Sequence, residues 1–328
     1  MRPAQLGEET FELADFSRLP TRCRFVAFLP QWDFLNFLAQ KARAFPNFRL
    51  LMETEAIGLL CEGNAIAGVR VKDRAGERDI AASLTIAAEG RHSRLRDAAG
   101  FKIRTLGAPM DVLWFKLAPR PNEAPAAFGR ITGDGMLVRF FRGDYWQCAL
   151  IIRKGSFEAI KARGLEAFRA RVARLAARDS ADEIASWDDV RLLTVAVDRL
   201  PRWHRPGLLF IGDAAHAMSP IGGVGINLAI QDVVATANRL AEPLRRGTLR
   251  DADLASVEAR RRFPTWATQK LQTTMQNLVI DPVLDSRATP RPPAILKLAQ
   301  RLSLLRRIPA RVIGMGFRPE HVRSGRRT

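Results

Sequence analysis

The fold is decided by the stretch Leu208-Leu209-Phe210-Ile211-Gly212-Asp213-Ala214-Ala215-His216, followed by Pro220-Ile221-Gly222-Gly223-Val224-Gly225-Ile226-Asn227. The four apolar residues before Gly212 predict a short buried strand. Asp213 then places a carboxylate at the carboxyl end of that strand, where open α/β sheets bind their ligands. The glycines let the backbone approach a ligand closely, and a helix beginning near Gly225 would direct its free N–H groups and positive dipole end at an electron-rich ring or a phosphate.

This stretch resembles the second FAD fingerprint of the aromatic hydroxylases of the para-hydroxybenzoate hydroxylase type. In that fingerprint Gly-Asp is followed after six residues by Pro and then by Gly-x-x-Gly-x-Asn, and every fixed position is present here. The resemblance implies that Asp213 holds the ribityl chain and that Pro220 lies beside the isoalloxazine. It also implies that the backbone of the helix start faces the pyrimidine edge. The FAD-binding residues predicted from this stretch are Gly212, Asp213, Ala214, Pro220, Gly222, Gly225, Ile226 and Asn227.

A second match lies upstream, where a predicted strand Leu84-Thr85-Ile86-Ala87-Ala88 runs into Glu89-Gly90-Arg91-His92-Ser93-Arg94-Leu95-Arg96. It resembles the family's Asp-Gly motif, which closes over the FAD pyrophosphate region and the path of the nicotinamide donor. By that resemblance Glu89, Gly90 and Arg96 belong to the site, with the acidic residue and the last arginine tying the loop together. The chain departs from the family in having Glu89 where Asp is usual, which lengthens the acidic side chain by one methylene.

A third match is Phe28-Leu29-Pro30-Gln31-Trp32-Asp33-Phe34-Leu35-Asn36-Phe37-Leu38. Pro30 precedes a predicted helix whose Leu35 and Leu38 recur at helical spacing. The segment resembles the family's Gln at the head of an amphipathic helix, so Gln31 is predicted to contact the flavin's linker. The alternative is a surface glutamine in the first turn of the helix.

The family also opens with a strand and a GxGxxG turn that cradles the ADP half of FAD, and the sequence contains no such turn. Two explanations are open: the chain begins inside a longer reading frame, or it is a relative that has lost the adenine-binding half. Loss of the first strand of a parallel sheet would expose unpaired edges and apolar faces. We therefore expect an upstream strand-GxGxxG-helix extension in the natural gene, and its absence from the genomic DNA would refute this expectation.

The predicted fold class is α/β with an α+β insert: a Rossmann-like FAD-binding domain, incomplete at its N-terminus, with an antiparallel-sheet substrate domain and C-terminal helices. The predicted divisions are residues 1–106, 107–201 and 202–328. Strands are predicted near residues 10–13, 24–28, 50–61, 65–72, 78–82, 84–88, 112–117, 126–131, 136–141, 146–152 and 190–197. Helices are predicted near residues 157–163, 165–177, 225–244, 253–278 and 294–305.

Composition limits the class of protein. The chain has 328 residues, 47% of them hydrophobic, enough to bury a large core. Its three cysteines lack metal-ligand spacing, so no metal site or disulfide framework is expected. This use of cysteine favours a protein of the reducing cytoplasm. No apolar run reaches the length of a membrane span. The net charge of +18 is spread over dispersed arginines with few interleaved aromatics, which argues against nucleic-acid binding and leaves a basic approach for NAD(P)H or an anionic substrate open.

The resemblance implies an NAD(P)H-dependent monooxygenase. NAD(P)H reduces FAD, O₂ adds to give a flavin hydroperoxide, and the distal oxygen passes to an aromatic or lipophilic small molecule. Trp114 and Phe140 line an apolar substrate chamber or belong to ordinary sheet core. The four histidines form no triad or metal set, and no catalytic residue is assigned. An FAD-dependent reductase or dehydrogenase of the same fold and a truncated non-catalytic relative remain as alternatives. The basic segment 304–314 is expected to pack on its own domain or on a subunit partner, as in a homodimer, and contact of an amphipathic segment with a membrane surface is the alternative.

Overall fold

The computed structural model describes residues 4–6, 9–11, 14–120, 127–285 and 303–323. The chain forms two compact units, each built from segments that are far apart in the sequence. The first unit comprises Met1–Ala42, Ala108–Val195 and Thr273–Met315, and the second comprises Arg43–Gly107, Ala196–Gln272 and Gly316–Thr328.

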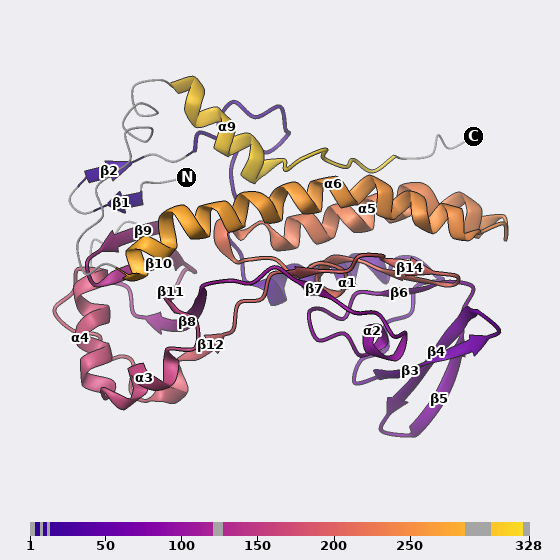
Figure 1. Ribbon diagram of the computed structural model, residues 1–328, viewed down its shortest axis with the longest axis horizontal. Helices are drawn as coiled ribbons and strands as arrows, with labels where there is room; N and C mark the ends of the chain where they lie inside the picture. Colours follow the sequence, from indigo (N-terminus) through magenta and orange to yellow (C-terminus); the bar gives the residue numbers. More distant parts are fainter. Residues whose placement is uncertain (1–3, 7–8, 12–13, 121–126, 286–302, 324–328) are drawn as a thin grey trace. The chain divides into compact units, whose positions relative to one another are not determined.

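A seven-stranded sheet organises the first unit, in the order β12-β8-β11-β10-β9-β1-β2 (Figure 1). Every neighbouring pair is antiparallel except β1 and β9, which are parallel. The strands, in this order, are Arg191–Leu193, Met110–Leu117, Trp146–Arg153, Gly135–Phe141, Ala127–Thr132, Ala4–Leu6 and Glu9–Phe11. The antiparallel sheet predicted between residues 107 and 201 is therefore present, and β1 and β2 extend it from the start of the chain.

Two helices, α3 (Phe157–Ala162) and α4 (Leu165–Ala176), belong to the same unit as the sheet. Phe168 of α4 is buried in one core cluster with Leu113, Trp146 and other strand residues, and it packs edge-on against Phe115. Leu113, Phe115 and Leu117 of β8 all lie in this cluster, because every second side chain of a strand points to the same face of the sheet.

The remaining elements of the first unit are helical. Helix α1 (Gln31–Ala42) begins at the predicted residue, but none of its side chains is buried. The strand predicted over Arg24–Phe28 is wrong: these residues are irregular, and the Phe25 side chain is 67% exposed. An extended segment becomes a strand only where a neighbouring strand accepts its hydrogen bonds. The structure describes the predicted helix 294–305 only from Ser303, where α9 (Ser303–Gly314) begins.

The second unit contains a small parallel pair and an antiparallel meander. β15 (Leu208–Phe210) pairs in parallel with β6 (Thr85–Ala87), and β14 (His204–Arg205) pairs antiparallel with β15. The meander consists of β3 (Glu55–Glu62), β4 (Ala65–Asp73) and β5 (Gly76–Ala81), and a short pair joins β7 (Arg104–Thr105) to β13 (Asp198–Arg199).

Two long helices accompany these strands. Helix α5 (Gly225–Arg245) begins at the predicted glycine, and α6 (Asp251–Met275) runs alongside it (Figure 1). A π-helical turn (Gln276–Ile280) and α7 (Asp281–Asp285) continue α6 into the first unit. The three residues of β15 are fully buried, and they pack in one cluster with Leu240 of α5 and Leu254 of α6. The predicted α/β architecture is confirmed.

The turn between β14 and β15 offers a test of its close approach to β4. Gly207 has a φ of +75°, and a Cβ added there would lie 1.9 Å from the carbonyl oxygen of Ile66. We expect Gly207→Ala to lower the free energy of unfolding by about 3 kcal/mol or more, because left-handed strain and overlap with backbone add together.

The matched control is Gly63→Ala. Gly63 has a φ of +58°, but its added Cβ would meet nothing within 4 Å. Gly63→Ala should therefore lower the free energy of unfolding only by the strain of a left-handed backbone, about 1–2 kcal/mol. Urea denaturation of both variants measures the difference, and equal losses would contradict the close approach at Gly207.

Candidate flavin site

The site begins where β15 ends. Gly212 has a φ of +57°, a left-handed conformation that turns the chain sharply out of the strand. A Cβ at this position would lie 3.2 Å from the Cβ of Ala229 on α5, so the glycine also permits close packing of the helix. Asp213 follows in a short 3₁₀ turn, and its side chain is 35% exposed. The predicted carboxylate therefore lies at the end of a parallel strand with access to solvent.

The charge environment of Asp213 is mixed. Burial is the largest influence and raises the pKa of this carboxyl, while the positive charges of Arg91 and His216 partly oppose that rise. The ion pair with Arg91 is long, at 3.9 Å. This arrangement leaves the carboxylate oxygens able to accept hydrogen bonds from hydroxyl groups of a ligand.

The Glu89-Gly90 loop is closed by its own acidic residue. Glu89 accepts a hydrogen bond from the Ser93 hydroxyl at 2.6 Å and one from the amide of Arg94 at 3.1 Å. Ser93 in turn caps α2 (Arg94–Ala98) by accepting the Arg96 amide hydrogen bond. Gly90 has a φ of +84° and supplies the reversal that brings Glu89 over the start of the helix. The longer side chain of glutamate thus reaches the loop that it is predicted to close.

Arg96 connects the two predicted motifs. Its side chain is buried and donates to the carbonyl oxygens of Ala214 (3.2 Å) and Arg91 (2.8 Å). Because Ala214 belongs to the Gly212-Asp213 turn, this arginine links the Glu89-Gly90 loop to that turn. Arg96 thus brings together residues more than a hundred positions apart in the sequence.

The glycine-rich turn leads to an exposed helix start. Gly222 and Gly223 have φ values of +78° and +63°, and both lie on the surface, as do Ile226 and Asn227 in the first turn of α5. Pro220 accepts a hydrogen bond from the Gly223 amide, and this bond closes the turn. The first amides of a helix have no partner in their own helix, so this end of α5 presents N–H donors to a ligand.

Gln272, which the sequence analysis missed, supports this turn from α6. Its buried side-chain amide donates to the carbonyl oxygens of Ser219 (2.8 Å) and Ile221 (2.9 Å), the residues on either side of Pro220. The position of Pro220 is thereby fixed by a residue fifty places further along the chain.

Three predicted residues lie in the first unit. Gln31 begins α1 and has an exposed side chain there. Trp114 and Phe140 are partly buried on β8 and β10, and the ring of Phe140 lies 5.4 Å from that of Phe28. The contact of Gln31 with a flavin and the substrate chamber remain predictions.

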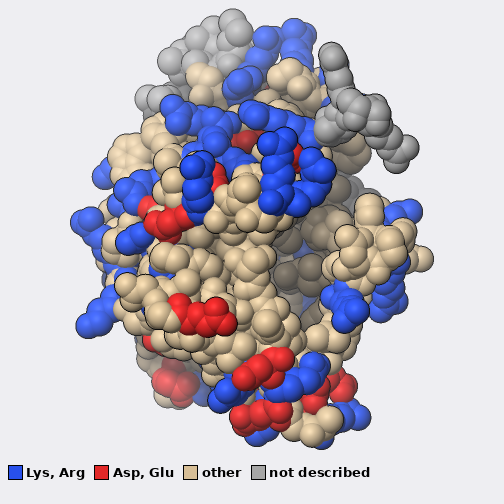
Figure 2. All heavy atoms as spheres, turned by 90° about the vertical axis from the view of Figure 1, so that its right-hand side faces the viewer, with Lys and Arg blue, Asp and Glu red and all other residues tan. Residues whose placement is uncertain are grey.

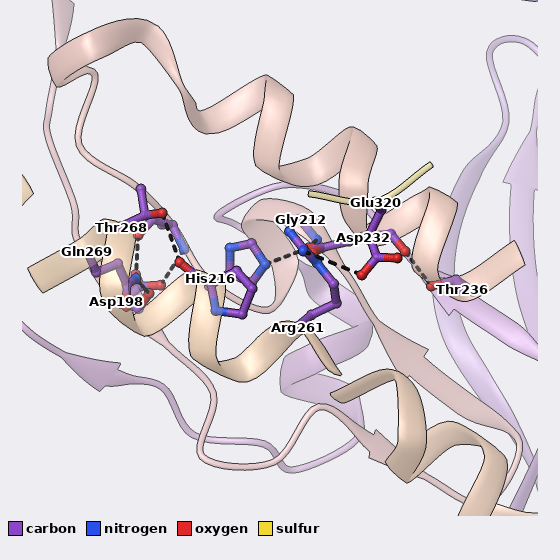
Figure 3. A network of polar contacts seen from close by, with 11 residues as sticks. Asp198, Gly212, His216, Asp232, Thr236, Arg261, Thr268, Gln269 and Glu320 are labelled. Atoms are coloured by element: carbon purple, nitrogen blue, oxygen red, sulfur yellow. Dashed lines mark hydrogen bonds and ion pairs between the residues drawn. The ribbon is translucent and has the colours of Figure 1, made fainter. Parts of the chain in front are cut away.

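A second feature missed from the sequence is the buried ionic network behind the Gly-Asp turn (Figure 3). One oxygen of Asp232 accepts from the amide of Gly212 at 3.1 Å and lies 2.6 Å from Nε2 of His216. Its other oxygen accepts from Nε of Arg261 at 2.8 Å. Asp232 and Arg261 are completely buried. Burial disfavours the charged carboxylate, but the charges and hydrogen bonds of His216 and Arg261 outweigh it, so the pKa of Asp232 is lowered.

The sequence carried a signal for this network. Leu228, Asp232 and Thr236 are spaced four residues apart, so a carboxylate stands on the buried face of α5. Helix α6 has a matching pattern, since its buried side chains include a run of polar ones at helical spacing: Glu258, Arg261, Thr265, Thr268, Gln269 and Gln272. A buried polar side chain must find a hydrogen-bond partner, so such a stripe indicates a helix that supports a functional loop.

Comparison with known proteins shows the family to which the chain belongs. Residues 3–271 match the family model described as FAD binding domain. The chain belongs to that FAD-binding family. The predicted resemblance to FAD-dependent aromatic hydroxylases is confirmed by its relatives, which are named as monooxygenases.

Two curated relatives show the extent of the similarity. The chain is 35% identical over 302 residues to 6-methylpretetramide 4-monooxygenase of Streptomyces rimosus, an alignment covering 90% of this chain and 72% of that protein. It is 31% identical over 185 residues to kynurenine 3-monooxygenase of Stenotrophomonas maltophilia, covering 50% of this chain and 39% of that one. The chain thus spans less than half of the second relative.

Solved structures share the fold at low identity. OxyS anhydrotetracycline hydroxylase from Streptomyces rimosus superposes with a TM-score of 0.68 at 19% identity, over 91% of this chain and 59% of that chain. PqsL of Pseudomonas aeruginosa, solved in complex with 2-aminobenzoylacetate, gives a TM-score of 0.70 at 21% identity, over 87% and 81%.

The residues of the second unit fit the flavin half of FAD. The cradle is formed by glycines with positive φ and an exposed helix start, and a half-exposed carboxylate stands at the end of the neighbouring strand. Donors of this kind suit the electron-rich pyrimidine edge, and the acceptor suits the ribityl hydroxyls.

Beyond this site, the described residues offer neither a metal centre nor a membrane span. Among the described residues, no cluster of His, Cys, Asp or Glu side chains is arranged to hold a metal ion. Within the same residues, no helix is both long enough and apolar enough to cross a bilayer. Lys and Arg outnumber Asp and Glu on the face shown in Figure 2, where acidic residues lie among them. Several exposed arginines are paired with carboxylates, including Arg70 with Asp79 and Arg245 with Glu242.

Proposed function

We propose that the second unit binds the flavin half of FAD and that the protein is an NAD(P)H-dependent monooxygenase that hydroxylates an aromatic or lipophilic small molecule. The observation that carries the proposal is the junction made by Arg96. This buried arginine joins the Glu89-Gly90 loop to the Gly212-Asp213 turn, in a chain whose match to the FAD-binding family covers both.

The proposed roles are those that the resemblance to the family's motifs implies, and the position of each residue in the second unit supports them. Asp213 accepts hydrogen bonds from the ribityl hydroxyls, and the first amides of α5, at Gly225, Ile226 and Asn227, hold the pyrimidine edge. Pro220, whose neighbours are held by Gln272, lies beside the isoalloxazine ring. Gln31 is proposed to contact the linker between the ring and the pyrophosphate.

Bound FAD would supply the redox chemistry: with two electrons from NAD(P)H, one atom of O₂ would enter the substrate and the other would leave as water. The helix dipole of α5 stabilises negative charge at the ring edge, so this chain's own contribution includes favouring the reduced, anionic flavin. The substrate class is proposed by analogy with the relative named as a 6-methylpretetramide 4-monooxygenase.

The test has two steps. The purified 328-residue chain is incubated with FAD and desalted, and we expect a visible flavin spectrum to remain with the protein. A panel of phenolic and fused-ring aromatic compounds is then screened for stimulation of NAD(P)H oxidation under ¹⁸O₂. Label in a hydroxylated product supports the proposal, whereas substrate-dependent oxidation of NAD(P)H without incorporation indicates a reductase or dehydrogenase. A version extended to an upstream in-frame start is tested alongside. Flavin retained only by the extended version would place the ADP-binding half outside this chain, and absence of flavin from both versions would contradict the assignment of the site.

A further inference from the structure

The segment Gly316–Arg323 lies outside the region that matches the FAD-binding family, which ends at residue 271. It nevertheless belongs to the second compact unit. We refer to these residues as the C-terminal strap.

The strap is held against both long helices. Asn238 of α5 donates to the carbonyl oxygen of His321 at 2.9 Å and accepts from the amide of Arg323 at 3.0 Å. On α6, the ring of Phe263 contacts the guanidinium of Arg318 at 5.2 Å from the ring centroid. These contacts attach the strap at two separate points.

Glu320, which lies between these points, and the backbone of Arg318 both face Arg261 of the buried network (Figure 3 shows Glu320). Glu320 is 9% exposed, forms an ion pair with Arg260, and lies 4.0 Å from Nη1 of Arg261. The carbonyl oxygen of Arg318 accepts from the same Nη1 at 3.5 Å. Arg261 is thus held between the strap on one side and Asp232 on the other.

The network continues without interruption to the Gly-Asp turn. Arg261 donates to one oxygen of Asp232, whose other oxygen binds the Gly212 amide and His216. Nη2 of Arg261 and Nδ1 of His216 have no hydrogen-bond partner within the described residues. Each of these two side chains is therefore positioned by the few contacts it does make, and loss of one contact should displace it.

We propose that the C-terminal strap is a positioning element for the flavin turn, acting through Glu320, Arg261 and Asp232 on Gly212 and His216. This inference rests on the proposed function in naming the ligand of the turn. Glu320 is a positioning residue, since it contacts neither the turn nor the glycine-rich cradle. The strap sets how rigidly the turn presents Asp213.

The test compares Glu320→Gln with a matched control, Glu242→Gln, which alters an exposed carboxylate on α5 that is paired with Arg245 and Arg246. Amide hydrogen exchange is measured in the flavin-free protein, and the Kd for FAD is measured by quenching of flavin fluorescence. We expect faster exchange at Gly212 and His216 and a Kd about tenfold higher in Glu320→Gln, with neither change in the control.

A second variant keeps the proposal testable if Glu320→Gln unfolds. Asn238→Ala removes both strap hydrogen bonds from a partly exposed position and should give the same local exchange signature. Unchanged exchange at Gly212 and His216 in a folded variant would overturn the inference. If neither the parent chain nor a version extended to an upstream in-frame start binds FAD, the proposed function fails, and the exchange result alone then decides whether the strap positions the turn.

Discussion

Replacing Asp213 with alanine should abolish retention of FAD by the chain. The carboxylate stands half-exposed at the end of β15, at the position where the fingerprint places the ribityl contact. A hydrogen bond to a charged group contributes about 1.5–3 kcal/mol, so the Kd for FAD should rise about 10- to 150-fold. Flavin absorbance after desalting and the Kd from fluorescence quenching measure the effect.

The control for this variant is Asp79→Ala. Asp79 is also a partly exposed aspartate of the second unit and is paired with Arg70, but it lies on β5 in the meander. Its removal should leave FAD retention unchanged. Undiminished FAD affinity in Asp213→Ala would refute the assignment of this residue.

Replacing Asp232 with alanine should give the largest loss of stability. The change leaves Arg261 buried without its carboxylate partner and removes the acceptor of the Gly212 amide. Breaking a buried ion pair by removing one partner costs about 3–5 kcal/mol. Urea denaturation should show a midpoint shift of corresponding size, and a loss close to zero would mean that the pair contributes no net stability.

The pH dependence of stability provides an independent check on Asp232. The pKa of Asp232 is lower in the folded state than the unfolded-state pKa of 3.8. Its contribution to folding stability is therefore fully present above pH 3.8 and is lost as the pH falls through the lowered folded-state pKa. The stability of the parent protein should therefore fall more steeply below pH 3.8 than that of Asp232→Ala. Equal acid slopes in the two proteins would contradict the ionised carboxylate.

Local patterns in the sequence were sufficient to predict the strand-turn-helix unit formed by β15, its turn and α5. Four apolar residues, a glycine-aspartate pair and a helical periodicity from Gly225 each act over a few residues, so β15, its turn and α5 were located correctly. The same holds for β8 to β11, which were predicted as four strand-like runs separated by Pro, Gly and Asp turns. The strand expected at Arg24–Phe28 failed because hydrophobicity alone does not provide a partner strand.

The supports of the site depend on tertiary packing. Asp232 and Arg261 are 29 residues apart, and Gln272 reaches Ser219 from 53 residues away. Their spacing on α5 and α6 marks buried polar faces, but it does not say which polar group each will meet. That choice follows from how the two helices lie against the strands and against each other.

The sequence by itself determined the class of the protein and predicted its flavin fingerprint, because both depend on residue types at fixed short spacings. Only the tertiary structure decided that Arg96 joins the two motifs, that a buried ion pair holds the Gly-Asp turn, and that residues 316–323 reach that pair. Hydrogen bonds and ion pairs between distant segments form only after the chain has folded, so their partners are selected by the packing of the whole unit and not by local sequence.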